Sequence, residues 1–343
     1  MIPADIDAFL REDETVPIID VRSEGEFAAG HIPGAFNIPV LPNEERRLVG
    51  ICYKKEGHIA AVDLGYKLVG HRFYDYIQQA RALPSKGKIR LHCWRGGLRS
   101  RIMGQLLSNA GFEVQVLAGG YKSFRQYVLN QFALQYSVHI ISGLTGSGKT
   151  DLLKALAGAG EQVIDLEKLA NHKGSAFGAL GLPPQPPQEQ FENDLAFALK
   201  GIDTSQPVYV EDESRSIGSV VLPEAFWTQM REAEYYEIQV PEEQRLKRIL
   251  HEYGNFPKSV LAEKTLQLKK RLGNKRAGEL VDFLNAGDLE SWIIGLFEYY
   301  DKTYNYGRSK RPLLKKQIVS LTDVNDASQF MEAVKKQKGA KAP

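Results

Sequence analysis

VHIISGLTGSGKT, residues 138–150, joins an apolar strand to a glycine-rich turn and then to the start of a helix. The turn fits the pattern G-x-x-x-x-G-K-[ST] in full. In such a turn backbone N–H groups wrap a polyphosphate, the lysine reaches its terminal charge, and the last hydroxyl can hold Mg²⁺. We therefore predict a phosphate-binding loop within a parallel α/β sheet. Its residues are Gly143, Thr145, Gly146, Ser147, Gly148, Lys149 and Thr150.

Polar residues follow the next two expected strands of this sheet, at 162–165 and 207–211. The segment 165–178 stands where small phosphate-loop kinases hold their second substrate, although a solvated loop is the alternative. Asp212 is our choice for the metal-facing acid, and the acids of this stretch could instead form salt bridges with Arg215. The expected substrate-binding residues are Asp165, Glu167, His172, Lys173, Ser175, Asp212 and Arg215.

A second reactive segment, LHCWRGGLRS at residues 91–100, places Cys93 between a strand end and a helix start. Gly96 and Gly97 let the loop curl so that its N–H groups converge, and the helix dipole adds partial positive charge. Arg95 and Arg99 add full charges. We expect this setting to hold the thiol largely as thiolate, which is the nucleophilic form, or to bind an anion.

The composition and length predict two domains of ordinary size. The chain has 343 residues, of which 43% are hydrophobic, and a net charge of +2. Its two cysteines cannot form a disulfide scaffold, and no apolar run approaches the ~20 residues of a membrane span. We expect a cytoplasmic monomer with an α/β domain at 1–130, a phosphate-loop core at 131–240, and a helical, basic part at 241–343.

Two further segments carry a resemblance to a known family. IIDVRSEGEF at 18–27 and GHIPGAFNIP at 30–39 resemble the paired signatures of rhodanese domains. The resemblance implies that Asp20, Arg22 and His31 support the cysteine loop, and that Cys93 carries sulfur or selenium. His-Cys-x5-Arg-Ser is also the cradle of cysteine phosphatases, so the loop alone leaves both activities open.

A rhodanese-like domain followed by a phosphate-loop domain resembles the tRNA 2-selenouridine synthases. The resemblance spans nearly the whole chain, from CWRGG at 93–97 to GLTGSGKT at 143–150 and EDESRSIG at 211–218. It implies the fold class: an N-terminal rhodanese-like domain and a parallel-sheet P-loop domain with a mainly helical C-terminal part.

The same resemblance implies a two-stage reaction on tRNA that carries 2-thiouridine at the wobble position. The thiocarbonyl sulfur first attacks geranyl diphosphate, and selenium from selenophosphate then replaces the geranylthio group to give 2-selenouridine. Cys93, Arg95, Arg99 and Lys149 would be catalytic. No cofactor would be tightly bound, although Thr150 could hold Mg²⁺. The candidates for a geranyl pocket are Phe177, Leu180, Leu182 and Phe191.

The C-terminal third would supply the tRNA surface, because Lys and Arg are concentrated between Arg245 and Arg276. Tyr299, Tyr300, Tyr304 and Tyr306 could stack on bases, although such a cluster is more often core. Two rival functions remain at this point. One is a rhodanese-fold phosphatase fused to a small-molecule kinase, and the other is a sulfur-relay or nucleotide-sensing adaptor.

Overall fold

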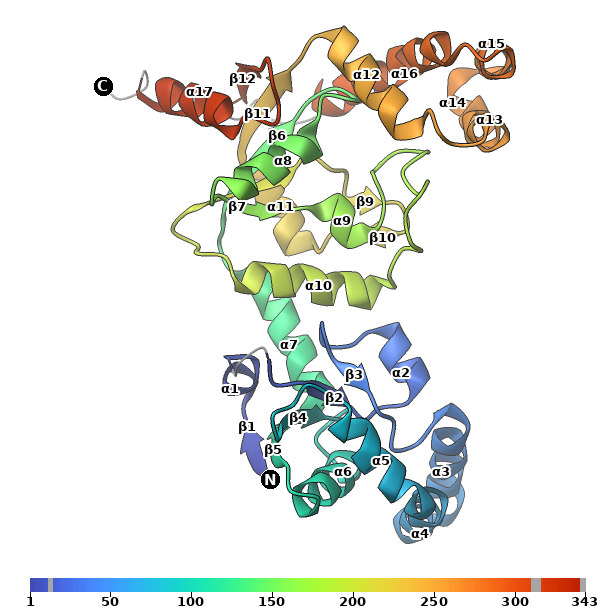
Figure 1. Cartoon of the computed structure of the whole chain (residues 1–343), viewed down its shortest axis with the longest axis vertical. Coiled ribbons are helices and arrows are strands. Elements are labelled where there is room, and N and C mark those ends of the chain that lie inside the picture. The colour runs from blue at the N-terminus through green and yellow to red at the C-terminus, as the bar shows by residue number, and fades with distance from the viewer. Residues whose placement is uncertain (12–14, 310–315, 340–343) are drawn as a thin grey trace. The chain divides into compact units, whose positions relative to one another are not determined.

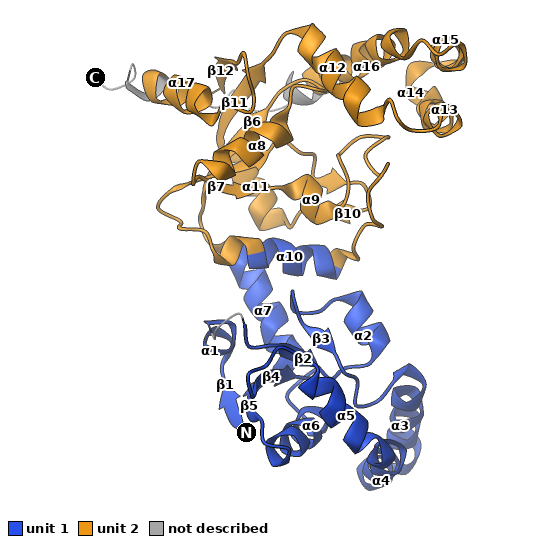
Figure 2. Cartoon of the chain, in the orientation of Figure 1, with its two compact units in different colours: residues 1–132, 189–197 blue, residues 133–188, 198–343 orange. Residues whose placement is uncertain are grey.

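The computed structural model describes residues 1–11, 15–309 and 316–339. The chain divides into two units, shown in Figure 2. Unit 1 contains residues 1–132 and 189–197, and unit 2 contains residues 133–188 and 198–343.

Unit 1 is built on a five-stranded sheet in which every pairing is parallel (Figure 1). Its strands, in spatial order, are β1 (Ile2–Ala4), β5 (Glu113–Leu117), β4 (Lys88–His92), β2 (Ile18–Asp20) and β3 (Phe36–Asn37). The helices of this unit are α1 (Ile6–Arg11), α2 (Glu24–Ala29), α5 (Phe73–Arg81), α6 (Leu98–Asn109) and α7 (Gly120–Ala133), with a 3-10 turn at Gly70–Arg72. Parallel strands that alternate with helices confirm the predicted α/β class.

A helical hairpin lies between β3 and β4. It consists of α3 (Asn43–Glu56) and α4 (His58–Val69), which pack against each other and reverse direction at Gly57. Gly57 has φ +90°, a conformation that glycine adopts without strain. Several large apolar side chains of the hairpin remain exposed, including Tyr53 at 57% and Ile59 at 78%. The hairpin was not predicted as a separate feature.

Unit 2 contains a second five-stranded parallel sheet. Its strands, in spatial order, are β12 (Lys316–Ser320), β11 (Glu234–Gln239), β6 (Ser137–Ser142), β8 (Pro207–Glu211) and β7 (Gln162–Ile164). Strand β6 is central in this order. Its residues from Val138 to Ser142 are buried, as is typical of a strand that is covered on both faces of the sheet. Around the sheet lie α8 (Lys149–Gly158), α9 (Leu166–Ala170), α11 (Glu224–Glu232), α17 (Ala327–Gly339) and the antiparallel pair β9 (Ser216–Ile217) and β10 (Val220–Val221).

The C-terminal part is mainly helical, as predicted. Its helices are α12 (Glu242–Tyr253), α13 (Lys258–Gln267), α14 (Lys269–Leu272), α15 (Asn274–Ala286) and α16 (Leu289–Ser309). They share a core around Leu261, Leu280 and Trp292, which also takes in Phe177. Strand β12 is the exception to the helical prediction. Its alternating burial suits a strand that adds to the edge of the sheet beside β11.

One helix is divided between the two units. Helix α10 (Gln188–Lys200) falls within the predicted segment 131–240, yet its residues 189–197 belong to unit 1 (Figure 2). Asn193 Nδ2 donates to Tyr121 Oη at 2.8 Å and to the His31 carbonyl at 3.0 Å. Among the described residues, no helix is both long and apolar enough to cross a membrane.

Candidate functional site

The cysteine loop of unit 1 connects the end of β4 to the start of α6. Cys93 is only 3% exposed, and its Sγ lies 3.2 Å from Oγ of Ser100. Ser100 Oγ is also 3.0 Å from the carbonyl of Gly97, to which it can donate. A serine hydroxyl has one proton, so Ser100 can accept from the Cys93 thiol or turn to donate to its thiolate. Ser100 was not among the predicted site residues, although it directly follows Arg99.

The first residues of α7 fix the shape of this loop. Gly120 has φ +60°, and a Cβ placed there would lie 2.7 Å from Gly96 N and closer still to the Cys93 carbonyl oxygen. The backbone N–H of Tyr121 donates to that same carbonyl at 2.8 Å. Only glycine fits so close to the loop backbone, and the start of α7 therefore helps to hold Cys93 in place.

Arg95 of the loop and Arg99 in the first turn of α6 differ in their surroundings. Arg99 forms an ion pair with Glu26 at 2.7 Å, and Glu26 also pairs with Arg46 at 2.9 Å. Burial alone would raise the pKa of Glu26, but the hydrogen bond and charge of Arg99 hold that pKa at about 2. Arg95 is exposed, and no ion pair is found for it among the described residues. Arg95 is therefore the loop cation that is available to an incoming anion.

The predicted supporting residues lie beside the loop. Asp20 and Arg22 form a buried ion pair at 2.7 Å, and Arg22 also donates to the Gly30 carbonyl at 2.6 Å. Asp20 pairs in the sheet with His92, the residue before Cys93. Burial lowers the pKa of His92 despite the charge of Asp20, so the imidazole is neutral. His31 stacks on Phe27 with ring centroids 3.8 Å apart.

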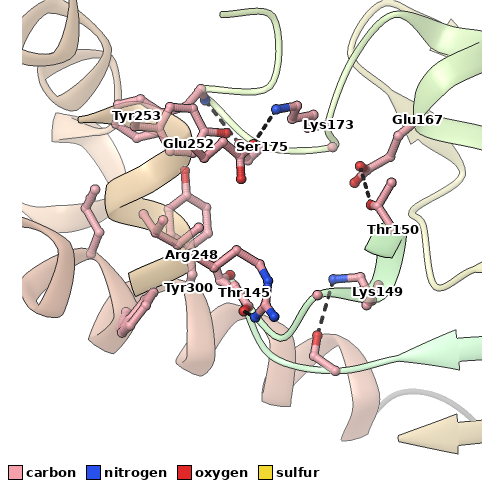
Figure 3. Close-up of a pocket in the computed structure, with 18 of the residues that line it drawn as sticks. Thr145, Lys149, Thr150, Glu167, Lys173, Ser175, Arg248, Glu252, Tyr253 and Tyr300 are labelled. Atoms are coloured by element: carbon pink, nitrogen blue, oxygen red, sulfur yellow. Dashed lines mark hydrogen bonds and ion pairs between the residues drawn. The ribbon is translucent and has the colours of Figure 1, made fainter. Parts of the chain in front are cut away.

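In unit 2 the phosphate loop runs from β6 to α8. Gly146 and Gly148 both have positive φ, at +77° and +82°, which the curled backbone requires. Figure 3 shows the side chains that surround the loop. Lys149 Nζ lies 3.4 Å from the Gly143 carbonyl, so this ammonium group reaches back over the curve of the loop.

The loop opens into a cavity of about 730 Å³. The structure brings together at this cavity most of the predicted phosphate- and substrate-binding residues: Gly143, Thr145, Gly146, Gly148, Lys149, Thr150, Glu167, Lys173, Ser175 and Asp212. Ser147 is instead buried beneath the loop at 1% exposure.

Three predicted substrate residues are absent from the cavity wall. Asp165 caps α9 by accepting from Lys168 N at 2.8 Å, and Arg215 pairs with Glu224 on the surface. His172 is half-buried, and burial lowers its pKa, so its ring is neutral.

Two arginines of α12 brace the phosphate loop from outside. Arg245 donates to the Thr145 carbonyl at 2.8 Å and pairs with Asp301 at 2.8 Å. Arg248 donates to the Gly146 carbonyl at 2.6 Å. The sequence analysis assigned both arginines to the basic surface that would bind tRNA. For Arg245 that placement is wrong, because its side chain is 6% exposed and its charge is used inside the unit.

Acidic residues after β8 point in different directions. Asp212 Oδ2 accepts from Ser142 Oγ at 2.7 Å, Tyr235 Oη at 2.8 Å and Tyr304 Oη at 3.2 Å. Tyr304 therefore serves this internal network, together with a 3.0 Å bond from Gly143 N. Such a carboxylate, held by three hydroxyls, stiffens the base of the phosphate loop.

Glu167 and Glu213 form a second acidic group that faces the loop. Thr150 Oγ1 lies 3.4 Å from Glu167 Oε2. Burial and the neighbouring Glu167 raise the pKa of Glu213 well above its ordinary value, while Lys149 opposes the shift. Mg²⁺ in phosphate loops takes a hydroxyl, one or two carboxylates and substrate oxygens. Thr150 with this pair of acids fits such an ion, and the sequence had not singled out Glu213.

An apolar wall faces the phosphate loop across the cavity. Its large side chains come from α12, α16 and the segment before α10: Phe177, Tyr253, Trp292, Ile293, Leu296, Phe297 and Tyr300. Of the four predicted geranyl-pocket residues, Phe177 lines the wall and Leu180 packs in the same core. Leu182 and Phe191 are absent from the lining, and Phe191 lies in the part of α10 that belongs to unit 1.

Fold and sites together define a rhodanese-like domain fused to a P-loop α/β domain. Comparison with family models supports this class. Residues 3–127 match the rhodanese-like domain, and residues 136–338 match the tRNA 2-selenouridine synthase AAA domain. The chain belongs to the tRNA 2-selenouridine synthase family.

Similar proteins named tRNA 2-selenouridine synthase cover most of the chain. The protein of Shewanella denitrificans is 37% identical over 86% of this chain and 89% of its own length. That of Shewanella piezotolerans is 39% identical with the same coverage. That of Nitrosomonas eutropha is 42% identical over 69% of this chain and 63% of its own length.

Proposed function

We propose that this protein is a transferase that modifies 2-thiouridine at the wobble position of tRNA, first by geranylation and then by exchange of sulfur for selenium. One observation carries the proposal. A phosphate loop and an aromatic wall share one cavity of about 730 Å³ in unit 2, which suits a ligand with a diphosphate head and an apolar tail. A nucleoside triphosphate has no comparable apolar tail.

In the first stage, the thiocarbonyl sulfur attacks C1 of geranyl diphosphate. A C–S bond forms, the C–O bond breaks, and diphosphate leaves with the bonding electrons while N3 of the base loses its proton to solvent. Lys149 and the loop N–H groups stabilise the charge that grows on the leaving oxygen. A Mg²⁺ ion bound by Thr150 and the acids would neutralise more of that charge. The wall at Phe177 and Tyr300 holds the terpenyl chain.

In the second stage, the selenium of selenophosphate attacks C2, the C2–S bond breaks, and the geranylthio group departs as a thiol. Water then cleaves the P–Se bond, which releases phosphate and leaves 2-selenouridine. Cys93 lies in the loop that binds selenophosphate, and Arg95 attracts this anion to the loop. Ser100 offers a hydrogen bond to whichever sulfur species occupies the position. The two stages thus use separate sites, one in each unit.

Mass spectrometry of nucleosides tests the proposal. The protein is incubated with 2-thiouridine tRNA, geranyl diphosphate and selenophosphate. We expect S-geranyl-2-thiouridine and then 2-selenouridine. Lys149→Ala should abolish the first product, whereas Cys93→Ala should accumulate it without selenation. Cys52→Ala is the matched control and should make both products, because Cys52 lies in α3 and is absent from both cavities.

Loss of both products in a folded Cys93→Ala variant would overturn the division between the sites. Untouched 2-thiouridine in the presence of a folded wild-type protein would overturn the proposed function. Hydrolysis of simple phosphate esters by that same protein would then favour the phosphatase alternative.

A further inference from the structure

A second cavity, of about 830 Å³, opens beside Cys93 in unit 1. Its size lies within the range of ~300–1,000 Å³ found for small-molecule sites. Selenophosphate is a compact, fully polar anion and would fill only a small part of it. The remaining volume therefore calls for another ligand group.

The wall of this cavity is mostly apolar and comes largely from the α3–α4 hairpin. Its aliphatic side chains are Val40, Leu41, Val49, Ile51, Ala61, Val62, Val69, Leu98 and Ile102. Two glycines widen it, Gly50 of α3 and Gly65 of α4, and a Cβ at either would meet no heavy atom within 4 Å. Glycine is unfavourable inside helices, so two on facing helices point to space that the hairpin keeps open.

Cationic groups gather where this apolar wall meets the cysteine loop. Arg95 of the loop and Arg99 of α6 line the cavity together with Arg46 and Lys54 of α3. Arg46 and Arg99 share Glu26, whereas Arg95 has no ion-pair partner among the described residues. The cavity therefore offers an anion-binding end next to Cys93 and an aliphatic remainder.

We propose that this second cavity binds the terpenyl chain of the S-geranyl nucleoside while its C2 atom lies beside Cys93. This inference rests on the proposed function, in which that nucleoside is the intermediate between the stages. The same ten-carbon chain would thus be bound twice, by the aromatic wall of unit 2 as its diphosphate and by the α3–α4 hairpin as its thioether. Burial of the chain positions the C2–S bond that selenation breaks.

The test uses the full chain and a synthetic anticodon stem-loop that already carries S-geranyl-2-thiouridine. Selenation is followed with selenophosphate, so geranyl transfer is not required. Val62→Asp places a charge in the apolar wall and should raise the KM for the S-geranyl RNA at least tenfold. Its effect should be smaller for an RNA with the five-carbon S-dimethylallyl group. Ile59→Asp is the control on the same helix, because Ile59 is 78% exposed and absent from the lining.

A second pair of variants guards against a folding defect. Gly50→Leu fills the cavity without a charge and should also raise the KM, whereas Gly70→Leu, at an open helical glycine outside the lining, should not. All variants should geranylate 2-thiouridine RNA at the wild-type rate. A wild-type KM in folded Val62→Asp and Gly50→Leu would overturn this inference while leaving the proposed function intact. Failure of the wild-type protein to make either product would overturn the proposed function itself.

Discussion

Glu213 is a buried acid that faces another acid and a lysine. Its side chain lines the cavity at the phosphate loop together with Glu167, Lys149 and Thr150. Burial raises the pKa of Glu167 as well, and the charge of Lys149 counteracts it. Ionisation of both of these buried, adjacent carboxyls is energetically unfavourable unless a cation binds between them. Each carboxyl of the ligand-free pair therefore keeps its proton up to a higher pH than an exposed glutamate does.

We predict that the Glu213→Gln variant is more stable than the wild-type protein in the absence of ligand, and that this difference grows as pH rises. A carboxyl whose pKa is higher in the folded than in the unfolded state favours folding below its ordinary pKa of 4.5. That contribution is lost as pH rises towards the folded-state pKa. The amide cannot ionise, so the variant should have a higher Tm than wild type at pH 8, and this difference should be larger than at pH 5.

Thermal unfolding between pH 5 and 8 measures this effect. The difference between variant and wild type should grow with pH. Glu243→Gln is the control, because Glu243 forms an exposed pair with Lys247 on α12. Parallel stability curves for Glu213→Gln and wild type would contradict a raised pKa at this residue.

At the scale of elements, the start of α7 matters as much to the cysteine loop as the loop's own sequence. Gly120 and Tyr121 meet the backbone of residues 93–96 directly. Parallel sheets place such helix starts and loops at the same edge, because every strand ends there. The α7 start thereby fixes the loop in which Cys93 and Arg95 are presented.

We predict that Gly120→Ala destabilises unit 1 by more than ~3 kcal/mol, because a methyl group would overlap the loop backbone in addition to straining φ. Gly111→Ala is the matched control. Gly111 has φ +98° and open space around it, so only the backbone strain of about 1–2 kcal/mol applies. Urea unfolding measures both. An equal loss of unfolding free energy in the two variants would show that the structure accommodates a methyl group at Gly120 without a further loss of stability.

Elements defined by local patterns could be predicted from the sequence, whereas contacts between distant segments could not. The phosphate loop, from Gly143 to Thr150, forms from consecutive residues, and its strand and helix are confirmed. Tyr253 and Tyr300 lie more than 100 residues further along the chain, and nothing local marks them as neighbours of the loop. Arg245 looked like a surface cation because a sequence does not show which charges become buried.

The hairpin α3–α4 escaped prediction for a different reason. Its apolar residues do not form one continuous face, since some line a cavity and others, such as Leu48 and Ile59, are exposed to solvent. Periodicity identifies helices that bury one stripe against a core. A helix pair that encloses open space breaks that pattern.

At the scale of the whole molecule, recognition of tRNA requires basic residues that remain free of internal roles. Arg245 and Arg248 are engaged by the phosphate loop, and Lys247 pairs with Glu243. Lys269 and Lys270 of α14 are exposed, and no ion pair is found for either in the described part of the chain. These two lysines are therefore better candidates for contacts with RNA phosphates.

We predict that the double variant Lys269→Ala/Lys270→Ala weakens tRNA binding and reduces its salt dependence. Each lost phosphate contact should lower the slope of log K against log salt by about 0.7–0.9. Binding measured from low to high salt gives this slope. Lys335→Ala/Lys336→Ala removes the same charge from exposed positions on α17 and should leave the slope unchanged. An unaltered slope in the α14 variant would exclude these lysines from the interface.

The divided helix α10 has a consequence for how the protein is made. Unit 1 needs residues 189–197, whose Asn193 supports Tyr121 and His31, yet the ribosome produces them 57 to 65 residues after residue 132. At ~5–20 residues per second, that delay is roughly 3–13 s. During this delay, unit 1 lacks residues 189–197, although the strand that precedes the phosphate loop has already been synthesised. We infer that unit 1 reaches its native state only after synthesis of unit 2 is well under way.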